Sequence, residues 1–408
     1  MWLMRYNAWY HWIFSIALAA MAYGFALSGG NFSVLVLAQG SVFLTAAVGF
    51  LFRGCARFRR RNIVLLCALS VVMISTVLFN TGNYSQASVP LQFALAHVAG
   101  IIGILFALQW AATNLVAQTV LRNLVLLLAP LVMLAIAVSL QSSGFTSRQS
   151  PFGIHPNWWG ELGFALTGCA LALSHWKARA LPLALTAVLF VLVQSRGALL
   201  AAVSATTIYL LLSTRWQRFF RPFRLAMTSL LLISVGAVLL VYQDHPIQAW
   251  LFLRDEVLLW NDPYRGVDSG LTGRLFGWQE AFEIFMEKPI IGNGIDTLSD
   301  VHNGFFRLAG EGGIILLLTI AALIGAGLSH ALKARNYLAV SIILGYLIYT
   351  MTYPRMLNMN LAAAVFYLSV FPWKEDFDER LNQRPKRGHI VRQSSLYPKI
   401  PDGLAAGR

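Results

Sequence analysis

Long apolar stretches recur along almost the whole chain, and short polar segments separate them. Each stretch is close to the length that an α-helix needs to cross the hydrocarbon core of a bilayer, roughly 20 residues. We therefore predict twelve membrane-spanning helices, over residues 11–28, 32–52, 63–80, 90–110, 118–139, 157–174, 180–194, 197–213, 225–243, 309–329, 337–352 and 359–373. The pattern indicates an all-α, polytopic integral membrane protein.

The composition agrees with this class. Hydrophobic residues make up 57% of the 408 residues and charged residues only 12%, and the mean hydropathy is +0.63. Soluble domains carry about 25% charged residues, so the apolar content exceeds what a buried core needs. The three cysteines, Cys55, Cys67 and Cys169, fall in a predicted cytoplasmic loop and in two spans. This placement predicts neither a disulfide framework nor a cysteine metal site.

The distribution of positive charge sets the predicted topology. The spans at 180–194 and 197–213 are short and could instead form one kinked helix, which would invert every later segment. With twelve spans and both termini in the cytoplasm, 23 of the 31 Lys and Arg residues lie inside and 8 outside. Because positive loops stay in the cytoplasm, the charge favours two separate helices. Anionic headgroups of membrane lipids account for the net charge of +14, and we expect no nucleic-acid partner.

The polar segments predict one transmembrane domain over residues 1–373, followed by a basic cytoplasmic tail at 374–408 that we expect to be disordered. A single outside loop, 244–308, is far longer than a connecting turn. Within it, residues 274–287 have the periodicity of an amphipathic helix lying at the membrane surface. Its predicted apolar face comprises Trp278, Ala281, Phe282 and Phe285, and its polar face Glu280, Glu283 and Glu287.

Three arginines on the outer side could bind a phosphorylated ligand. Arg196 lies at the turn between the two short spans, where an arginine either lines a polar cavity or snorkels to the interface. Arg274 begins the amphipathic helix, and both its guanidinium group and the helix N-terminus attract phosphate. Arg265, a few residues earlier in the loop, would extend the same cationic surface.

Two histidine motifs lie on the predicted outer side. His302 can exchange a proton near neutral pH, and Asn303 can orient a hydroxyl group, although a structural role at a helix start is the alternative. In HPNWWGE, His155 to Glu161, Asn157 is a candidate helix N-cap and the tryptophans suit an interfacial belt. The alternative is that His155 or Asn157 lines an acceptor site. No paired-histidine pattern accompanies them, so no metal ion is expected; Asp255–Glu256 remains the clearest alternative for a divalent cation.

Three motifs in a fixed order carry a resemblance to a known family. They are QSRGALLAA from Gln194, GRLFGWQEAFEIFMEKPIIGNG from Gly273 and VHNGFFRLAGEGGI from Val301. The sequence resembles the O-antigen ligase and Wzy-type polymerase superfamily of bacterial envelope glycosyltransferases over roughly residues 155–325. The family pattern is an Arg-Gly at a membrane turn, an Arg-x-x-x-Trp helix leading to Pro-x-x-Gly-x-Gly, and a His-Asn before a glycine-rich helix start.

The resemblance implies a GT-C-like fold acting on the periplasmic side of the bacterial inner membrane, without a metal ion, nucleotide sugar or other cofactor. The donor would be a glycan on undecaprenyl diphosphate, and an acceptor hydroxyl would attack its anomeric carbon with inversion. Arg196 and Arg274 would neutralise the diphosphate, and His302 would accept the hydroxyl proton. The residues expected to bind substrate are Asn303, Arg265, Asn157, His155 and Glu311.

Several alternatives stay open at this point. A ligase would transfer the glycan to lipid A–core, which we favour, whereas a polymerase would transfer it to another lipid-linked glycan. A polysaccharide-lipid transporter or flippase is the competing class, and it predicts charged or broken helices at the bilayer midplane. Arg307 and Glu311 could pair with each other or contact substrate. The oligomeric state is not predicted.

Overall fold

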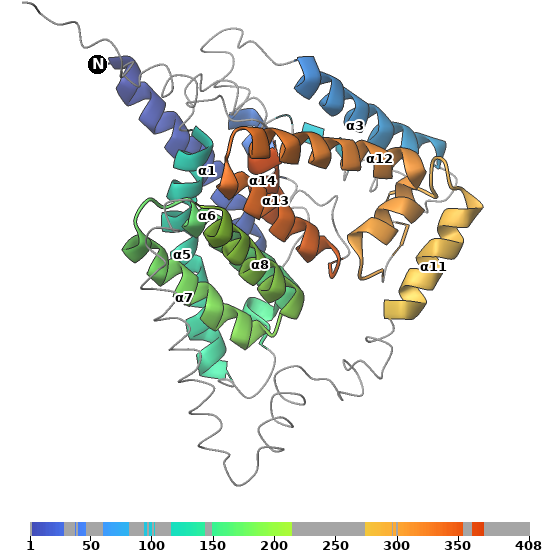
Figure 1. The fold of residues 1–408 in the computed structure, drawn as a ribbon. Helices are drawn as coiled ribbons and strands as arrows, with labels where there is room; N and C mark the ends of the chain where they lie inside the picture. Colours follow the sequence, from blue (N-terminus) through green and yellow to red (C-terminus); the bar gives the residue numbers. More distant parts are fainter. Residues whose placement is uncertain are drawn as a thin grey trace, which may run out of the picture. The chain divides into compact units, whose positions relative to one another are not determined.

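The computed structural model describes ten α-helices of this chain (Figure 1). The described residues are 2–27, 37, 40–45, 60–80, 94–95, 98–99, 102, 116–142, 149–213, 274–295, 297–298, 301–353 and 361–370. They contain no β-strand, so the prediction of an all-α fold is confirmed for them. The predicted spans near 32–52, 90–110 and 225–243, the loop before residue 274 and the tail fall largely or wholly outside the described residues.

The described helices are α1 (Trp2–Leu27), α3 (Arg60–Phe79), α5 (Val116–Ser142), α6 (Pro156–Leu171), α7 (Trp176–Val193), α8 (Arg196–Leu212), α11 (Arg274–Glu287), α12 (Gly304–Lys333), α13 (Tyr337–Thr350) and α14 (Leu361–Val370). Nine of the described helices overlap predicted apolar stretches, although α1 begins nine residues and α12 five residues before the predicted start, and α11 is the predicted amphipathic helix. Among the described residues, Gln118–Gln141, Trp176–Val193 and Gly304–Lys333 are long and apolar enough to cross a membrane. Shorter apolar helices cover His11–Leu27, Cys67–Phe79, Arg196–Leu212 and Tyr337–Thr350.

Helices α7 and α8 form a hairpin and are not one kinked helix. The chain breaks at Gln194, which takes a left-handed conformation with φ of +48°. Arg179 in the first turn of α7 reaches Tyr209 in the last turn of α8, with Nη2 donating to the hydroxyl oxygen over 3.0 Å. Two residues 30 positions apart can meet in this way only if the second helix returns alongside the first. The prediction of two separate helices is confirmed.

Arginines also close the end of α6 that the charge pattern places at the cytoplasmic side. Arg122 of α5 donates from Nε to the carbonyl oxygen of Ala172 over 3.1 Å, and Arg179 donates from Nε to that of Leu173 over 2.7 Å. The last carbonyl groups of a helix have no partner within the helix. These two guanidinium groups therefore satisfy the end of α6 and tie α5 and α7 to it.

Helices α6 and α13 pack against each other, and each also contacts α8 and α14 (Figure 1). The buried face of α8 consists of alanines, Ala198, Ala201, Ala202 and Ala205. Gly345 of α13 lies directly against that face: a Cβ atom at this position would come within 2.7 Å of the Ala205 Cβ atom. Small residues allow helix backbones in membranes to approach closely, and this contact fixes the separation of α8 and α13.

This close contact gives a stability prediction. Gly345→Ala should destabilise the protein by about 1–3 kcal/mol, because the added methyl group must displace α8. Gly325→Ala in α12 is the matched control, since no atom lies within 4 Å of its Cβ position, and there alanine should be neutral or slightly stabilising. Thermal unfolding in detergent measures both. Equal midpoints for the two variants would contradict the packing described.

Candidate active site

Helix α12 is broken near its start. Gly313 has φ of +63° and ψ of −169°, which separates a short segment, Gly304–Gly312, from the long segment that continues to Lys333. At the break, four backbone groups of α12 form hydrogen bonds with backbone outside this helix. They are the carbonyl groups of Gly310 and Glu311 and the N–H groups of Ile314 and Ile315. Unsatisfied backbone groups are costly in an apolar environment, so this break needs partners.

The loop that follows α11 supplies those partners. The N–H groups of Asn293 and Gly294 donate to the carbonyl oxygens of Gly310 and Glu311 over 2.9 and 2.8 Å. In return, the carbonyl oxygens of Pro289 and Ile290 accept from the N–H groups of Ile314 and Ile315 over 2.8 and 3.4 Å. We call residues 289–294 the docking loop. Four backbone hydrogen bonds thus join it to both sides of the break.

Glycines in both motifs make this docking possible. Gly292 has φ of +71°, and a Cβ atom there would collide with the backbone of Glu311 and Gly312. A Cβ atom on Gly313 would collide with the carbonyl group of Ile290. Backbones this close, at positive φ, exclude other residues. The Pro-x-x-Gly-x-Gly and Glu-Gly-Gly motifs of the sequence are therefore two halves of one contact.

Asn80, just after α3, is a further partner of the docking loop. Its Nδ2 group donates to the carbonyl oxygen of Gly292 over 3.2 Å, and its Oδ1 atom accepts from Nζ of Lys288 over 3.1 Å. Asn80 is buried. In the predicted topology Asn80 ends a span, and the sequence pattern predicts no role for it. The available signal was a polar residue directly after an apolar helix, which is too common to single out.

Helix α11 packs against the short segment of α12. Ala281 is buried with Leu298 and Val301, and Trp278 stacks on Phe306 with ring centroids 5.7 Å apart. Glu280, Glu283 and Glu287 are exposed, as the predicted polar face requires. The predicted apolar face needs one correction, because Phe282 is 53% exposed while Ile284 packs inward. Arg274 is the first residue of α11, as predicted.

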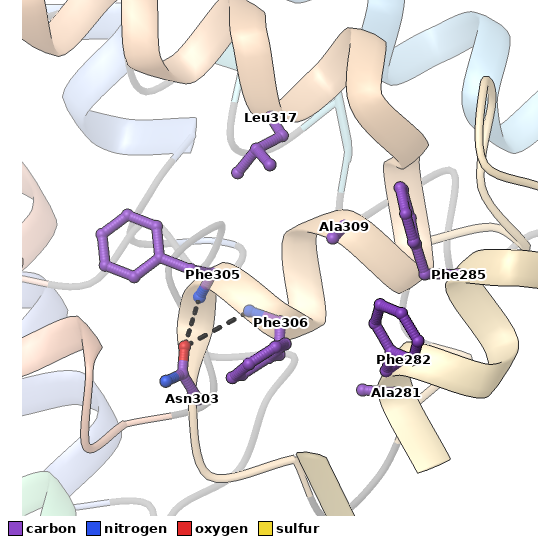
Figure 2. A pocket seen from close by; sticks show the side chains of 8 residues that line it. All are labelled: Ala281, Phe282, Phe285, Asn303, Phe305, Phe306, Ala309 and Leu317. Atoms are coloured by element: carbon purple, nitrogen blue, oxygen red, sulfur yellow. Dashed lines mark hydrogen bonds between the residues drawn. The ribbon is translucent and has the colours of Figure 1, made fainter. Parts of the chain in front are cut away.

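His302 and Asn303 lie at the start of α12. Asn303 is the N-cap: its Oδ1 atom accepts from the N–H groups of Phe305 and Phe306 over 2.9 and 3.2 Å (Figure 2). This interaction satisfies two of the first N–H groups of the helix. His302, directly before the cap, is half-buried. Asn303 therefore has the structural role at a helix start that was the alternative for this motif. Its Nδ2 group takes no part in the cap.

Arg307 and Glu311 pair with each other. The Nε atom of Arg307 donates to Oε1 of Glu311 over 2.6 Å, and the Glu311 side chain is only 3% exposed. The same residue accepts from the docking loop through its backbone. A buried carboxylate held in this way supports the short helical segment. Because Glu311 is buried in this pair, the structure does not support the expected contact of Glu311 with substrate. We assign Glu311 a structural role in the short segment of α12.

A second group of predicted site residues lies at the start of α6. His155 is the N-cap of this helix, with Nδ1 accepting from the N–H group of Asn157 over 3.2 Å. The prediction of Asn157 as the N-cap is wrong, since Pro156 already occupies the first helical position, which suits its missing N–H group. His155 is exposed and Asn157 half-buried. Trp159 is also corrected: it is fully buried in the core and not part of an interfacial belt.

Arg196 lies beside this group as the first residue of α8, and its side chain is exposed. Gly160 of α6 lies against Ser195: a Cβ atom on Gly160 would collide with the Ser195 side chain. A Cβ atom on Gly197 would collide with Thr352, just after α13. The glycine next to Arg196 therefore allows the close approach of the chain that follows α13. These contacts hold the starts of α6 and α8 together.

Glu161 is a buried acid for which the sequence pattern predicts no separate role. It follows Gly160 in α6 and is only 2% exposed. Charged residues inside membrane proteins are rare and face other protein groups. The available signal was an acid a few residues inside a predicted span, although the motif that contains it was expected at the membrane surface.

The structure therefore gathers the predicted residues into two groups. His155, Asn157 and Arg196 lie at the packed starts of α6 and α8, while Arg274, His302, Asn303 and Glu311 belong to the α11–α12 pair. Arg265 lies outside the described residues. Within the described part of the chain, no cluster of three or more His, Cys, Asp or Glu side chains could hold a metal ion.

Comparison with known proteins agrees with the motifs. Residues 181–321 match the model of the O-antigen ligase family. The matched region contains Arg196, Arg274, His302 and the whole docking loop, and it begins after His155 and Asn157. No curated protein matches the chain. The family match confirms the resemblance to the O-antigen ligase and Wzy superfamily, and together with the apolar helices it identifies a membrane protein.

The buried ion pair gives a testable prediction. Glu311→Leu should lower stability by about 3–5 kcal/mol, because Arg307 would remain buried without this carboxylate. The double variant Arg307→Met with Glu311→Leu should recover most of the loss, since neither charge is then buried alone. Thermal unfolding of the wild type, both single variants and the double variant in detergent measures the coupling. A double variant less stable than either single variant would contradict the assignment.

Proposed function

We propose that this chain transfers a glycan from undecaprenyl diphosphate to an acceptor hydroxyl on the periplasmic side of the bacterial inner membrane. We further propose lipid A–core as the acceptor, as in an O-antigen ligase. The observation that carries the proposal is the docking of residues 289–294 into the break of α12, within the region that matches the family. It joins the helix that Arg274 begins to the segment that follows His302.

The arginines fit the leaving group of this reaction. Arg196 and Arg274 each stand at the first position of a helix, where the N-terminal N–H groups and the helix dipole favour anions. Guanidinium groups bind phosphate oxygens in bidentate fashion and stay charged at any relevant pH. We propose that both arginines neutralise the charge that develops on the diphosphate. Arg265 would contribute from the preceding loop.

His302 is the proposed proton acceptor. The acceptor oxygen attacks the anomeric carbon, the bond from that carbon to the diphosphate oxygen breaks, and the hydroxyl proton passes to His302. Attack opposite the leaving group inverts the anomeric configuration. The Nδ2 group of Asn303 would orient the hydroxyl, because its Oδ1 atom is engaged in the helix cap. No metal ion or other cofactor is part of the proposal, since the arginines perform the charge neutralisation.

His155 and Asn157 are proposed to bind the acceptor. They stand beside Arg196, at the packed starts of α6 and α8. The same arrangement serves a polymerase, in which the acceptor is a second lipid-linked glycan. The family match covers the donor-side residues but not His155 or Asn157. The ligase, which we favour, and the polymerase share the same donor, so only the identity of the acceptor distinguishes them.

The break in α12 bears on the transporter alternative. Transporters use broken helices whose free ends bind the substrate near the bilayer midplane. In α12 the docking loop occupies backbone groups on both sides of the break, at Gly310, Glu311, Ile314 and Ile315. A break satisfied by protein backbone offers these groups to no transported ligand, and this geometry favours the enzyme.

Activity measurements test the site. Purified protein in detergent, given lipid-linked glycan and lipid A–core without added metal, should release undecaprenyl diphosphate, and a chelator should not change the rate. Arg274→Ala and His302→Ala should each lower kcat/KM by about 10²–10³-fold. Arg274→Lys should recover only part of the loss, because lysine lacks the bidentate fork.

Matched controls come from the same kinds of residue elsewhere. Lys333→Ala removes an exposed cation at the far end of α12, and His175→Ala removes an exposed histidine before α7. Both should retain wild-type activity. Full activity of Arg274→Ala and His302→Ala would refute the proposed roles.

Topology provides a separate test. Reporter fusions after Arg218 should report the cytoplasm, and fusions after Asp262 the periplasm, because the excess of Lys and Arg retains the first of these loops inside. The periplasmic location is necessary for a reaction with donors on the outer side of the inner membrane. A cytoplasmic Asp262 would exclude the proposed mechanism.

A further inference from the structure

Two arginines meet at the end of α6 that the charge pattern predicts to be cytoplasmic. Arg122 of α5 and Arg179 of α7 donate from Nε to the carbonyl oxygens of two consecutive residues, Ala172 and Leu173. Helices α5, α6 and α7 all contact one another, so both guanidinium groups belong to one place in the fold (Figure 1). Arg179 is buried and Arg122 half-buried. We call these two residues the arginine pair.

Contacts with protein use only part of the hydrogen-bonding capacity of the arginine pair. A guanidinium group has five N–H donors. Arg122 uses Nε alone, and Arg179 uses Nε and, toward the hydroxyl group of Tyr209, Nη2. Within the described part of the chain, neither Nη atom of Arg122 and not the Nη1 atom of Arg179 donates to protein. These donors are therefore available to a ligand.

The chain has almost no carboxylate that could pair with the two charges. Glu161 is the first acid of the sequence and Asp244 the second. Glu161 lies roughly 16 Å before Ala172 along α6. In the predicted topology all five cytoplasmic acids lie in the tail at 374–408, where eight Lys and Arg residues outnumber them. Among the described residues the arginine pair forms no ion pair, so the counter-charge must come from outside the chain.

The helix end itself does not neutralise the arginine pair. A helix C-terminus carries about half a negative charge, which leaves roughly 1.5 of the two positive charges uncompensated. Lys177, exposed in the first turn of α7, adds a further cation. Both arginines lie a few residues inside helices of membrane-spanning length, Gln118–Gln141 and Trp176–Val193. Charged groups inside such helices pair with other groups, and at a helix end an anionic lipid headgroup is within reach.

Apolar residues continue from the arginine pair toward the middle of the two helices. Leu126 is one turn beyond Arg122 on the same face of α5 and is 65% exposed. Leu181, in the second turn of α7, is 64% exposed. Trp176, at the start of α7, is 57% exposed, as is typical of the aromatic belt at a membrane interface. A ligand here meets cations first and lipid-facing side chains one turn deeper, which is the order of phosphate and acyl chains in a phospholipid.

We propose that the arginine pair binds the phosphodiester group of an anionic phospholipid, whose acyl chains lie along Leu126 and Leu181. The Nη groups of Arg122 donate to the two non-bridging phosphate oxygens, for which the guanidinium fork is suited. Phosphatidylglycerol supplies the missing negative charge, whereas phosphatidylcholine carries a cation of its own and supplies none. The lipid is bound at the opposite end of α6 from His155 and takes no part in the proposed reaction.

The variant Arg122→Gln tests the site without breaking the end of α6. The Nε2 atom of glutamine is as many bonds from Cα as the Nε atom of arginine. It can therefore still donate to the carbonyl oxygen of Ala172, as Gln118 already does over 3.4 Å, but the charge and the Nη groups are gone. Arg335→Gln is the matched control, since Arg335 is an exposed arginine just after α12 on the same predicted side of the membrane.

Phospholipid titrations of the delipidated full-length protein in detergent measure the site, with native mass spectrometry and thermal unfolding as readouts. In the wild type, dioleoylphosphatidylglycerol should bind and raise the unfolding midpoint, whereas dioleoylphosphatidylcholine and inorganic phosphate at equal concentration should do neither. Arg122→Gln should unfold at the wild-type temperature without added lipid, and its Kd for phosphatidylglycerol should be at least about tenfold higher. Arg335→Gln should change this Kd by less than about twofold, because its charge is screened.

Four results would overturn the inference. Wild-type affinity in Arg122→Gln would show that this guanidinium group does not hold the lipid. An equal loss of affinity in Arg335→Gln would show a general attraction between a positive surface and anionic lipid. Equal binding of phosphatidylcholine would show an apolar site without charge recognition, and an equal effect of inorganic phosphate a site for small anions. No glycan transfer is measured, so the outcome does not depend on the proposed function.

Discussion

The candidate site depends on the backbone hydrogen bonds between the docking loop and the broken start of α12. A membrane-spanning helix normally satisfies its own backbone, and a break within apolar surroundings is stable only with partners from elsewhere. Residues 289–294 supply those partners on both sides of Gly313. As a result α11, the loop and both segments of α12 form one unit, and the side chains at the segment ends are held by backbone geometry and not by flexible contacts.

This arrangement explains why so many polar groups near the site serve structure. Asn303 caps the short segment, Arg307 and Glu311 pair within it, and Lys288 and Asn80 connect the loop to α3. A short helical segment has few internal hydrogen bonds, so it needs such external support. The support in turn fixes Asn303, and His302 before it, at the start of the segment.

The α6–α8 end of the molecule is built on a different principle, close packing of small residues. Alanines on α8, with Gly160, Gly197 and Gly345, let α6, α8 and α13 approach until almost any larger side chain would collide. Arg122 and Arg179 close the other end of α6. Arg196 therefore projects from the start of a helix whose position is fixed along its whole length, which suits a residue proposed to meet a charged diphosphate.

The sequence by itself determined the helical class, most helix bounds, the hairpin at residues 180–213 and the resemblance to a family, because apolar length, positive charge and short motifs can be read directly along the chain. It also located Arg196, Arg274 and His302 at helix starts. Only the tertiary structure decided that α12 is broken at Gly313, that Asn80 supports the loop, that Arg307 pairs with Glu311, and that His155 and not Asn157 caps α6. These features depend on which distant groups satisfy a given backbone or charged atom. That pairing is set by packing between segments that lie up to 212 residues apart in the sequence.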